Sequence, residues 1–477
     1  MKVLSVVSEV YPLIKTGGLA DVAGALPGAL KAEGVEVVTL VPGYPAVMAV
    51  LENASPVYWM DELFGGPATI LSADVDGLDL FVIEAKHLYD RPGGPYAGPT
   101  GEWADNPFRF AALSRVAAQI AYGEVPGFVP DVLHAHDWQA GLLPAYLRYD
   151  GRRHAPSVIT IHNLAFQGQY APTLLPLLGL PPDAYAIDGV EYYGTIGYLK
   201  AGIAIADKVT TVSPTYANEI LTDEGGMGLS GLLRVRGQDL VGILNGIDTS
   251  VWDPAADPLL ANCFALDTLG ERSLNKEALQ RSLGLEPNRD RLLFGVVSRL
   301  SWQKGLDLLA GALPKLRQLG AQLALVGTGE PELQDAFASA ARHFPRDIAT
   351  VIGYDEKLAH QVQAGVDALL VPSRFEPCGL TQLCALRYGA LPVVSRVGGL
   401  ADTVRDVDIE AGAATGIQFS PPSVEQLEGA LQRTADLWQD KSMWQTLQRN
   451  AMRQDVSWAQ PAAKYAALYR EIAGRRS

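Results

Sequence analysis

Polar and charged side chains follow the ends of short apolar runs along the whole chain. In the first half these are residues 15–21 (KTGGLAD), residues 134–138 (HAHDW), His162-Asn163 and Asn245-Gly246. In the second half they are Ser298-Arg299, residues 327–330 (GTGE), Gly353-Tyr354, residues 373–376 (SRFE) and Gly398-Gly399. Open parallel sheets bind ligands beyond the carboxyl ends of their strands, so we expect the chemistry of the protein at these positions.

A cation beside two glycines is the first candidate for phosphate binding. Gly17 and Gly18 lie between Lys15 and Asp21, where a helix is expected to begin. Glycine lets backbone N–H groups approach a phosphate, and a helix start favours negative charge. Taken alone, this block is better explained as an ordinary strand-to-helix turn with an exposed lysine. It also lacks the Gly-x-Gly-x-x-Gly run of dinucleotide-binding folds.

Two further cations, Arg299 and Lys304, lie just past another apolar run and precede Gly305. At a helix entrance they can neutralise a diphosphate leaving group as its charge develops; the alternative is solvated surface charge. Gly327 begins another glycine turn, which predicts a phosphate or nucleoside contact.

Residues 376–381 read EPCGLT and form the sharpest local motif. Because Pro377 suits the first turn of a helix, we expect Glu376 at a strand-to-helix corner, facing the ligand. The residues that follow would then present their backbone to a phosphate: Cys378, Gly379, Leu380 and Thr381.

Three histidines, His134, His136 and His162, raise the question of a metal site, because residues two apart on a strand share a face. No third ligand has a matching position, and Asp137 is as easily a hydrogen-bond acceptor. Recognition of sugar hydroxyls by Asp137, His162 and Asn163 is the better functional interpretation, with satisfied core histidines as the alternative. The cysteines have no metal-type spacing either, so we expect no metal and no cofactor.

Composition narrows the range of partners. The chain has 477 residues, 48% of them hydrophobic, and a formal net charge of -15. Such a charge argues against a nucleic-acid or anionic-membrane surface, which needs clustered cations. The apolar run at 3–7 is too short for a signal peptide, and no run approaches membrane-spanning length, so a cytoplasmic location is expected.

Short apolar runs alternate with longer helical stretches, which is typical of doubly wound α/β domains with parallel sheets. We expect strands at 3–7, 35–41, 78–83, 132–134, 158–161, 208–212 and 241–244, and a second series at 292–297, 322–326, 349–352, 368–371 and 392–394. The predicted domains are therefore 1–245 and 246–456, both Rossmann-like, with a final helix at 457–477 that can pack back on the first. Gly- and Pro-rich segments at 90–106 and 164–193, around Tyr96 and Phe166, are expected to be loops. They either contact an acceptor sugar or are merely anchored surface loops.

Six of these blocks together resemble the bacterial glycogen synthases and plant starch synthases. They are residues 15–22, 134–142, 162–164, 245–248, 299–307 and 373–383, in the order of that family. The resemblance implies a GT-B glycosyltransferase fold, with two Rossmann-like domains facing a central cleft. It also implies transfer of glucose from ADP-glucose to the non-reducing end of an α-1,4-glucan such as glycogen, with retention at the anomeric carbon.

The resemblance also assigns roles. Lys15 becomes a donor-binding residue, Arg299 and Lys304 hold the diphosphate, and Glu376 binds glucose hydroxyls. Asp137 and His162 face the sugar, Asn245 lies at the glucose side of the hinge, and Tyr354 faces the nucleoside. Many related retaining transferases have a second glutamate where this chain has Cys384, a departure that leaves the choice of base open. The alternatives are a UDP-glucose-dependent sucrose or trehalose-phosphate synthase, a nicotinamide dehydrogenase and a non-enzymatic sugar-binding protein.

Overall fold

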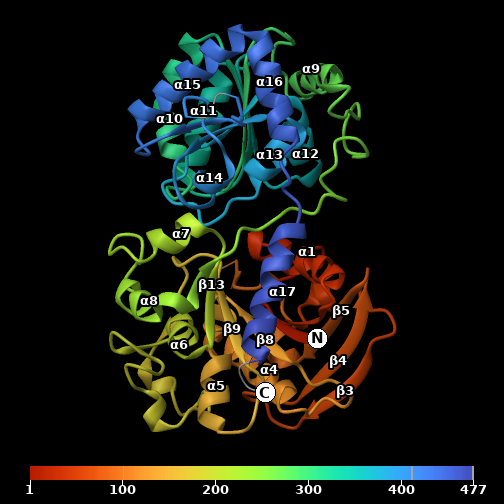
Figure 1. Ribbon diagram of the computed structural model, residues 1–477, viewed down its shortest axis with the longest axis vertical. Coiled ribbons are helices and arrows are strands. Elements are labelled where there is room, and N and C mark those ends of the chain that lie inside the picture. Colours follow the sequence, from red (N-terminus) through yellow and green to blue (C-terminus); the bar gives the residue numbers. More distant parts are fainter. Residues whose placement is uncertain (100, 410–411, 475–477) are drawn as a thin grey trace. The chain divides into compact units, whose positions relative to one another are not determined.

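The chain divides into two units (Figure 1). The computed structural model describes residues 1–99, 101–409 and 412–474. Unit 1 comprises Met1–Asn245 and Trp458–Ser477, and unit 2 comprises Gly246–Ser457. The chain thus leaves unit 1 after Asn245 and returns to it at Trp458; of the predicted final segment, residues 475–477 lie outside the described residues.

A twisted sheet forms the centre of unit 1 (Figure 1). Its strand order is β14 (Leu240–Gly242), β13 (Lys208–Thr211), β9 (Ser157–Ile161), β8 (Val132–His136), β1 (Lys2–Val6), β2 (Glu36–Pro42), β5 (Leu78–Glu84), β4 (Ala68–Val75) and β3 (Ser55–Met60). From β14 to β5 all neighbouring strands are parallel. Their apolar side chains are buried on both faces, which explains why the sequence reads as near-continuous apolar runs.

The antiparallel edge of this sheet was not expected, because the sequence analysis predicted parallel strands only. β4 pairs antiparallel with both β5 and β3. A tight turn at Asp76-Gly77, where both residues have positive φ, joins β4 to β5. Asp-Gly is a preferred pair for such hairpin turns, so the sequence did hold a signal for this edge.

Helices cover both faces of the sheet in unit 1. On one face, α1 (Gly18–Ala32) and α17 (Ala459–Gly474) pack against each other (Figure 1). The predicted apolar stripe of the last helix is buried there, with Tyr465 and Tyr469 fully enclosed. The other face carries α4 (Asn106–Ala121), α5 (Leu143–Asp150) and α6 (Tyr198–Ile205). Shorter helices are α2 (Pro45–Met48), α3 (Lys86–Tyr89), α7 (Pro214–Glu219) and α8 (Ser230–Arg236).

The two predicted loops contain small strands. Within the first, β6 (Ala97–Gly98) pairs with β7 (Gly101–Glu102), and residue 100 lies outside the described residues. The second contains β10 (Gln169–Tyr170), β11 (Glu191–Tyr192) and β12 (Thr195–Gly197), which form a small antiparallel sheet.

Unit 2 has a parallel sheet of its own. The order is β17 (Ile348–Ile352), β16 (Gln322–Gly327), β15 (Leu293–Val297), β18 (Ala368–Val371), β19 (Leu391–Ser395) and β20 (Ile417–Phe419). The helices around it are α9 (Arg272–Ser282), α10 (Leu306–Gln318), α11 (Pro331–His343), α12 (Glu356–Gly365), α13 (Thr381–Tyr388), α14 (Gly398–Thr403), α15 (Val424–Gln439) and α16 (Lys441–Met452). Both units are therefore doubly wound α/β domains, as the sequence predicts.

Candidate active site

The strand order of unit 1 reverses at β1, which lies between β2 and β8. A crevice opens at such a point because the chain leaves neighbouring strands in opposite directions. Glu9 follows β1, Asp137 follows β8, and His162 follows β9, all at the carboxyl edge of the sheet. The topology thus brings the predicted residues Asp137 and His162 to the position where such folds bind ligands.

Asp137 has both an unusual backbone and an unusual environment. Its φ is 54° and its ψ is -168°, a combination that is essentially reserved for glycine. Its Oδ1 accepts hydrogen bonds from the backbone N–H groups of His162 at 2.7 Å and Asn163 at 3.5 Å. Burial raises the pKa of Asp137 from 3.8 to about 7, although these two N–H groups lower it. A strained residue with a perturbed pKa at a crevice is typical of a functional site.

The rings of the three histidines lie next to one another, two on β8 and one just after β9. His134 and His136 share a face of β8 with their ring centroids 4.0 Å apart, and His136 Nδ1 lies 2.9 Å from His162 Nε2. Burial lowers the pKa of both His134 and His162 to about 3, and that of His136 well below 6.5. All three rings are therefore neutral at physiological pH.

The glycine turn begins α1 as predicted. Gly17 is the N-cap residue, with an extended backbone and no side-chain cap, and its Cα faces open space. Lys15 Nζ lies 2.8 Å from Asp21 Oδ1. A helix start and a cation suit an anion, but here Asp21 already pairs with the cation.

The other predicted residues of unit 1 lie in different settings. The hydroxyl of Tyr96 donates to Glu9 Oε1 at 2.5 Å, whereas Phe166 has 49% of its surface exposed. Asn163 Oδ1 accepts from the backbone N–H of Ala165 at 3.1 Å. Asn245 is buried at the end of unit 1, and its Oδ1 has no hydrogen-bond partner among the described residues. Their assigned roles stay predictions.

Unit 2 has its own reversal point, between β15 and β18. Lys304 lies in the loop after β15 and Glu376 in the loop after β18. Lys304 Nζ lies 2.6 Å from Glu376 Oε2, which also accepts from the hydroxyl of Ser373 at 2.9 Å. Glu376 is buried, so the ammonium compensates for the desolvation of its charge. The fold thus joins two predicted site residues that are far apart in sequence.

Arg299, the second predicted phosphate-binding cation, differs from Lys304. Its side chain is exposed, and the described residues offer it no ion pair. An exposed guanidinium at a reversal point is available to a phosphate without first breaking an internal contact.

The EPCGLT motif is arranged differently from the prediction. Pro377 was expected in the first turn of a helix, but α13 begins only at Thr381. The reason is Gly379, whose φ of 72° turns the chain before the helix begins. Pro377 and Cys378 are buried in the preceding loop, and Leu380 is the N-cap residue. The N–H groups of Leu380 and Thr381 are still at a helix start.

Close backbone approach explains two glycines of unit 2. A Cβ on Gly327 would lie 1.9 Å from the carbonyl oxygen of Ser298, and a Cβ on Gly398 would lie 2.0 Å from that of Glu376. Gly327 therefore packs the end of β16 against the loop of Arg299, and Gly398 packs the start of α14 against Glu376. Both glycines set the position of site residues. Tyr354 follows β17, is 66% exposed and donates its hydroxyl hydrogen bond to Glu356.

Sequence reasoning missed several residues that shape these edges. Glu9 is buried and accepts from the backbone and hydroxyl of Thr16, which fixes the turn before α1. In unit 2, Arg374 forms two hydrogen bonds to the carboxylate of Asp307, at 2.6 and 2.7 Å. These residues lie next to predicted motifs, but their contact partners depend on which strands are neighbours in the sheet.

Within 1–99, 101–409 and 412–474, no group of three His, Cys, Asp or Glu side chains is arranged to hold a metal ion. In the same ranges no helix has the length and apolarity to cross a membrane.

Comparisons with known proteins agree with this geometry. A family model described as the starch synthase catalytic domain matches residues 2–235, and one described as glycosyl transferases group 1 matches residues 277–451. Two proteins named glycogen synthase are 61% and 59% identical, from Rhodopseudomonas palustris (strain BisB18) and Methylocella silvestris. The alignments cover 99% and 100% of this chain and 98% and 99% of those proteins.

Solved structures resemble the chain along its length. The catalytic domain of starch synthase IV from Arabidopsis thaliana, bound to ADP and acarbose, is 32% identical with a TM-score of 0.91 and covers 99% of both chains. Sucrose-phosphate synthase from Thermosynechococcus elongatus, 18% identical with a TM-score of 0.59 over 99% of both chains, shares the fold.

The chain has two Rossmann-like units, each with charged side chains where its strand order reverses. Together with the two family models that match them, these units define a glycosyltransferase of the GT-B class. Within that class the chain belongs to the glycogen synthase family. The fold class and the family expected from the sequence are confirmed. The chain is therefore a glucosyltransferase enzyme, not a dehydrogenase or a non-enzymatic sugar-binding protein.

Proposed function

We propose that the protein transfers glucose from ADP-glucose to the non-reducing 4-hydroxyl of an α-1,4-glucan, with retention at the anomeric carbon. The observation that carries this proposal is the contact of Lys304 with Glu376 at the reversal point of unit 2. A cation for phosphate and a buried carboxylate for sugar hydroxyls are placed together, as a nucleotide sugar requires. ADP as the nucleotide is supported by the catalytic domain of starch synthase IV, which was solved bound to ADP and acarbose and is similar over 99% of both chains.

In this proposal the cationic side chains bind the phosphates of the donor. When the bond between C1 of glucose and the diphosphate breaks, negative charge develops on the departing oxygen. Arg299 and Lys304 stabilise that charge, assisted by the helix start that Leu380 and Thr381 form. Lys15 contributes a further cation beside the start of α1. No metal and no cofactor take part in this proposal, and a cytoplasmic location remains part of it.

Glu376 is better suited to hold glucose than to attack it. Its Oε2 already accepts from Lys304 and Ser373, which reduces its nucleophilicity. Asp137 is likewise held by two backbone N–H groups, and burial disfavours its charged form. Neither carboxylate is placed as a free nucleophile, so we favour attack of the acceptor from the same face that the diphosphate leaves.

The same-face step balances without a protein base. The 4-hydroxyl oxygen of the acceptor bonds to C1, the bond from C1 to the diphosphate breaks, and the hydroxyl proton passes to the departing phosphate oxygen. A neutral His162 does not repel the positive charge that develops at C1. Trapping a covalent glucosyl adduct on Glu376 or Asp137 by mass spectrometry would contradict this step.

A donor panel tests the proposed activity. Radiolabelled glucose is offered as ADP-glucose or as UDP-glucose, with glycogen as the acceptor, and label in the washed polymer is counted. We expect label from ADP-glucose, and a loss of at least a hundredfold in Glu376→Gln. Glu332→Gln, an exposed change on α11, is the matched control. Incorporation from UDP-glucose alone would contradict ADP-glucose as the donor and favour a transferase that uses UDP-glucose.

A further inference from the structure

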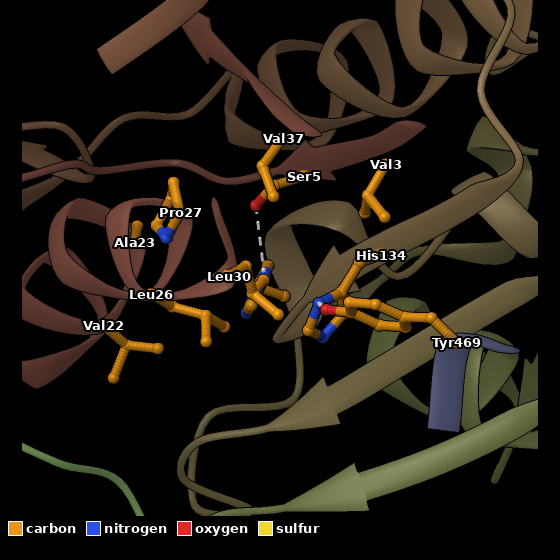
Figure 2. A pocket seen from close by; sticks show the side chains of 11 residues that line it. Val3, Ser5, Val22, Ala23, Leu26, Pro27, Leu30, Val37, His134 and Tyr469 are labelled. Carbon is orange, nitrogen blue, oxygen red and sulfur yellow. Dashed lines mark hydrogen bonds between the residues drawn. The ribbon is translucent and has the colours of Figure 1, made fainter. Parts of the chain in front are cut away.

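A buried polar array lies behind His162, inside unit 1. Part of this array lines a small cavity between the sheet and the helices α1 and α17. Ser5, His134 and Tyr469 lie there among apolar side chains (Figure 2). Polar side chains are costly to bury, so their retention in an otherwise apolar cavity needs a reason. Of the polar side chains that line the cavity, His136 lies at a hydrogen-bond distance of 2.9 Å from His162.

The contacts divide this array into two separate chains. In the first, Ser5 Oγ lies 3.3 Å from His136 Nε2 (Figure 2), and His136 Nδ1 lies 2.9 Å from His162 Nε2. In the second, His134 contacts the hydroxyl of Tyr469 at 2.7 Å and that of Thr160 at 2.6 Å. Only the first chain reaches the crevice, and it ends on the ring of His162.

A neutral imidazole carries one ring proton, so the partner of one ring nitrogen decides the state of the other. Burial keeps His136 and His162 neutral, since it lowers the pKa of both rings. The contact between them therefore has one donor and one acceptor. Two arrangements satisfy the chain, and they differ in whether Ser5 donates to His136 or accepts from it.

Ser5 selects between the two arrangements. It is buried, and among the described residues its hydroxyl has His136 as its hydrogen-bond partner. If Ser5 accepted from His136, its own proton would be left without an acceptor inside the protein, which is costly. Ser5 therefore donates to His136 Nε2, and His136 Nδ1–H donates to His162 Nε2. The proton of His162 is then on Nδ1.

We propose that Ser5 and His136 are positioning residues that hold His162 as its Nδ1–H tautomer, with that N–H directed to an oxygen of the bound sugar. This inference rests on the proposed function. Without the chain, the ring of His162 can rotate or exchange tautomers, and its crevice nitrogen can present a lone pair where the sugar needs a donor. A wrong orientation or tautomer of His162 lowers kcat more than it lowers the affinity for the donor, because the contacts to the donor phosphates stay intact.

Four variants separate positioning from general damage. Ser5→Ala removes the donor to His136, and His136→Leu removes the partner of His162. His136→Asn restores an amide N–H near the position of Nδ1. Thr39→Val is the matched control: Thr39 is buried opposite Ser5 in the register of β1 and β2, and its hydroxyl has no partner among the described residues.

The kinetic expectations are graded. Ser5→Ala should lower kcat about fivefold, the size of one neutral hydrogen bond, and should change KM for ADP-glucose by less than about twofold. His136→Leu should lower kcat about ten- to hundredfold because it leaves His162 Nε2 unpaired. His136→Asn should recover most of that loss, and Thr39→Val should match the wild type.

The tautomer itself is read by ¹⁵N NMR of the protein labelled at its seven histidines. The signal of His162 is assigned by its absence in His162→Gln. We expect a protonated Nδ1 in the wild type, in Thr39→Val and in His136→Asn, and a tautomer mixture in Ser5→Ala and His136→Leu. A protonated Nε2 in the wild type, or a His162 signal unchanged in both of the latter variants, would overturn the proposal.

Failure of the inference and failure of the proposed function have different signatures. A wild-type protein that transfers no glucose contradicts the function, whereas normal wild-type transfer with unaltered kcat in His136→Leu contradicts the positioning role alone.

Discussion

Replacing Asp137 with asparagine should make unit 1 more stable, and the gain should grow with pH. Asparagine has the same shape, and its Oδ1 can still accept from the backbone N–H of His162. It tolerates positive φ about as well as aspartate, so the strained backbone is retained. The change therefore removes mainly the cost of holding a buried negative charge.

The size of the effect follows from the pKa of Asp137. Burial raises it from 3.8 to about 7, a difference of about 3 pKa units, or about 4 kcal/mol at pH 8. The sign is that of a carboxyl whose folded pKa lies above its unfolded pKa: native stability is lost as pH rises from about 4 to about 7. At pH 5 the gain from Asp137→Asn should be only about 2 kcal/mol, and below pH 4 it should vanish.

Thermal unfolding from pH 4 to pH 8, followed by circular dichroism, measures this gain. We expect the melting temperature of Asp137→Asn to exceed that of the wild type by roughly 8 °C or more at pH 8, and by about half as much at pH 5. Turnover should fall in the same variant if the carboxylate orients the sugar. A difference that is constant across this pH range, or a destabilised variant at pH 8, would refute the assignment of a buried, proton-binding Asp137.

Three further predictions concern the phosphate site. Arg299→Ala should lose about a hundredfold in kcat/KM. Its melting temperature should stay within about 1 °C, because this side chain is exposed and has no ion pair among the described residues. A large loss of stability would contradict the exposed, unpaired position of Arg299. Lys304→Met should lose activity and also about 3 kcal/mol of stability, because it leaves Glu376 buried without its cation. Urea unfolding measures this loss, and an unchanged unfolding curve would show that the two residues are not coupled. Activity after exhaustive chelation should equal that before it, and a strict need for added Mg²⁺ would show that the phosphate site has been misread.

The parallel core of both units could be predicted from sequence for a physical reason. Strands buried on both faces are apolar nearly throughout, so β1, β15 and β18 stand out as short runs followed by polar residues. Strands that are half exposed lack this signal. β3 was missed because it is an edge strand with exposed residues such as Trp59, 60% exposed.

The site was predictable as a set of positions but not as a set of contacts. Strand ends identified Lys304 and Glu376 separately, while their pairing depends on β15 and β18 being neighbours. The helix start was placed wrongly at Pro377 because the local preference of proline was given more weight than the left-handed turn at Gly379. Ser5 gave no signal at all, since a serine within a buried strand gains its role only from the histidine on the neighbouring strand.

The central claim is tested most directly by the linkage that the enzyme makes. Purified protein is incubated with ADP-glucose labelled with ¹³C at C1 and with a short α-1,4-glucan, and the anomeric signals are followed by NMR. The account predicts new α-1,4-linked signals at the non-reducing end, with one ADP formed for each glucose added. A β-linked product, release of free glucose without chain growth, or ADP formation without transfer would contradict it.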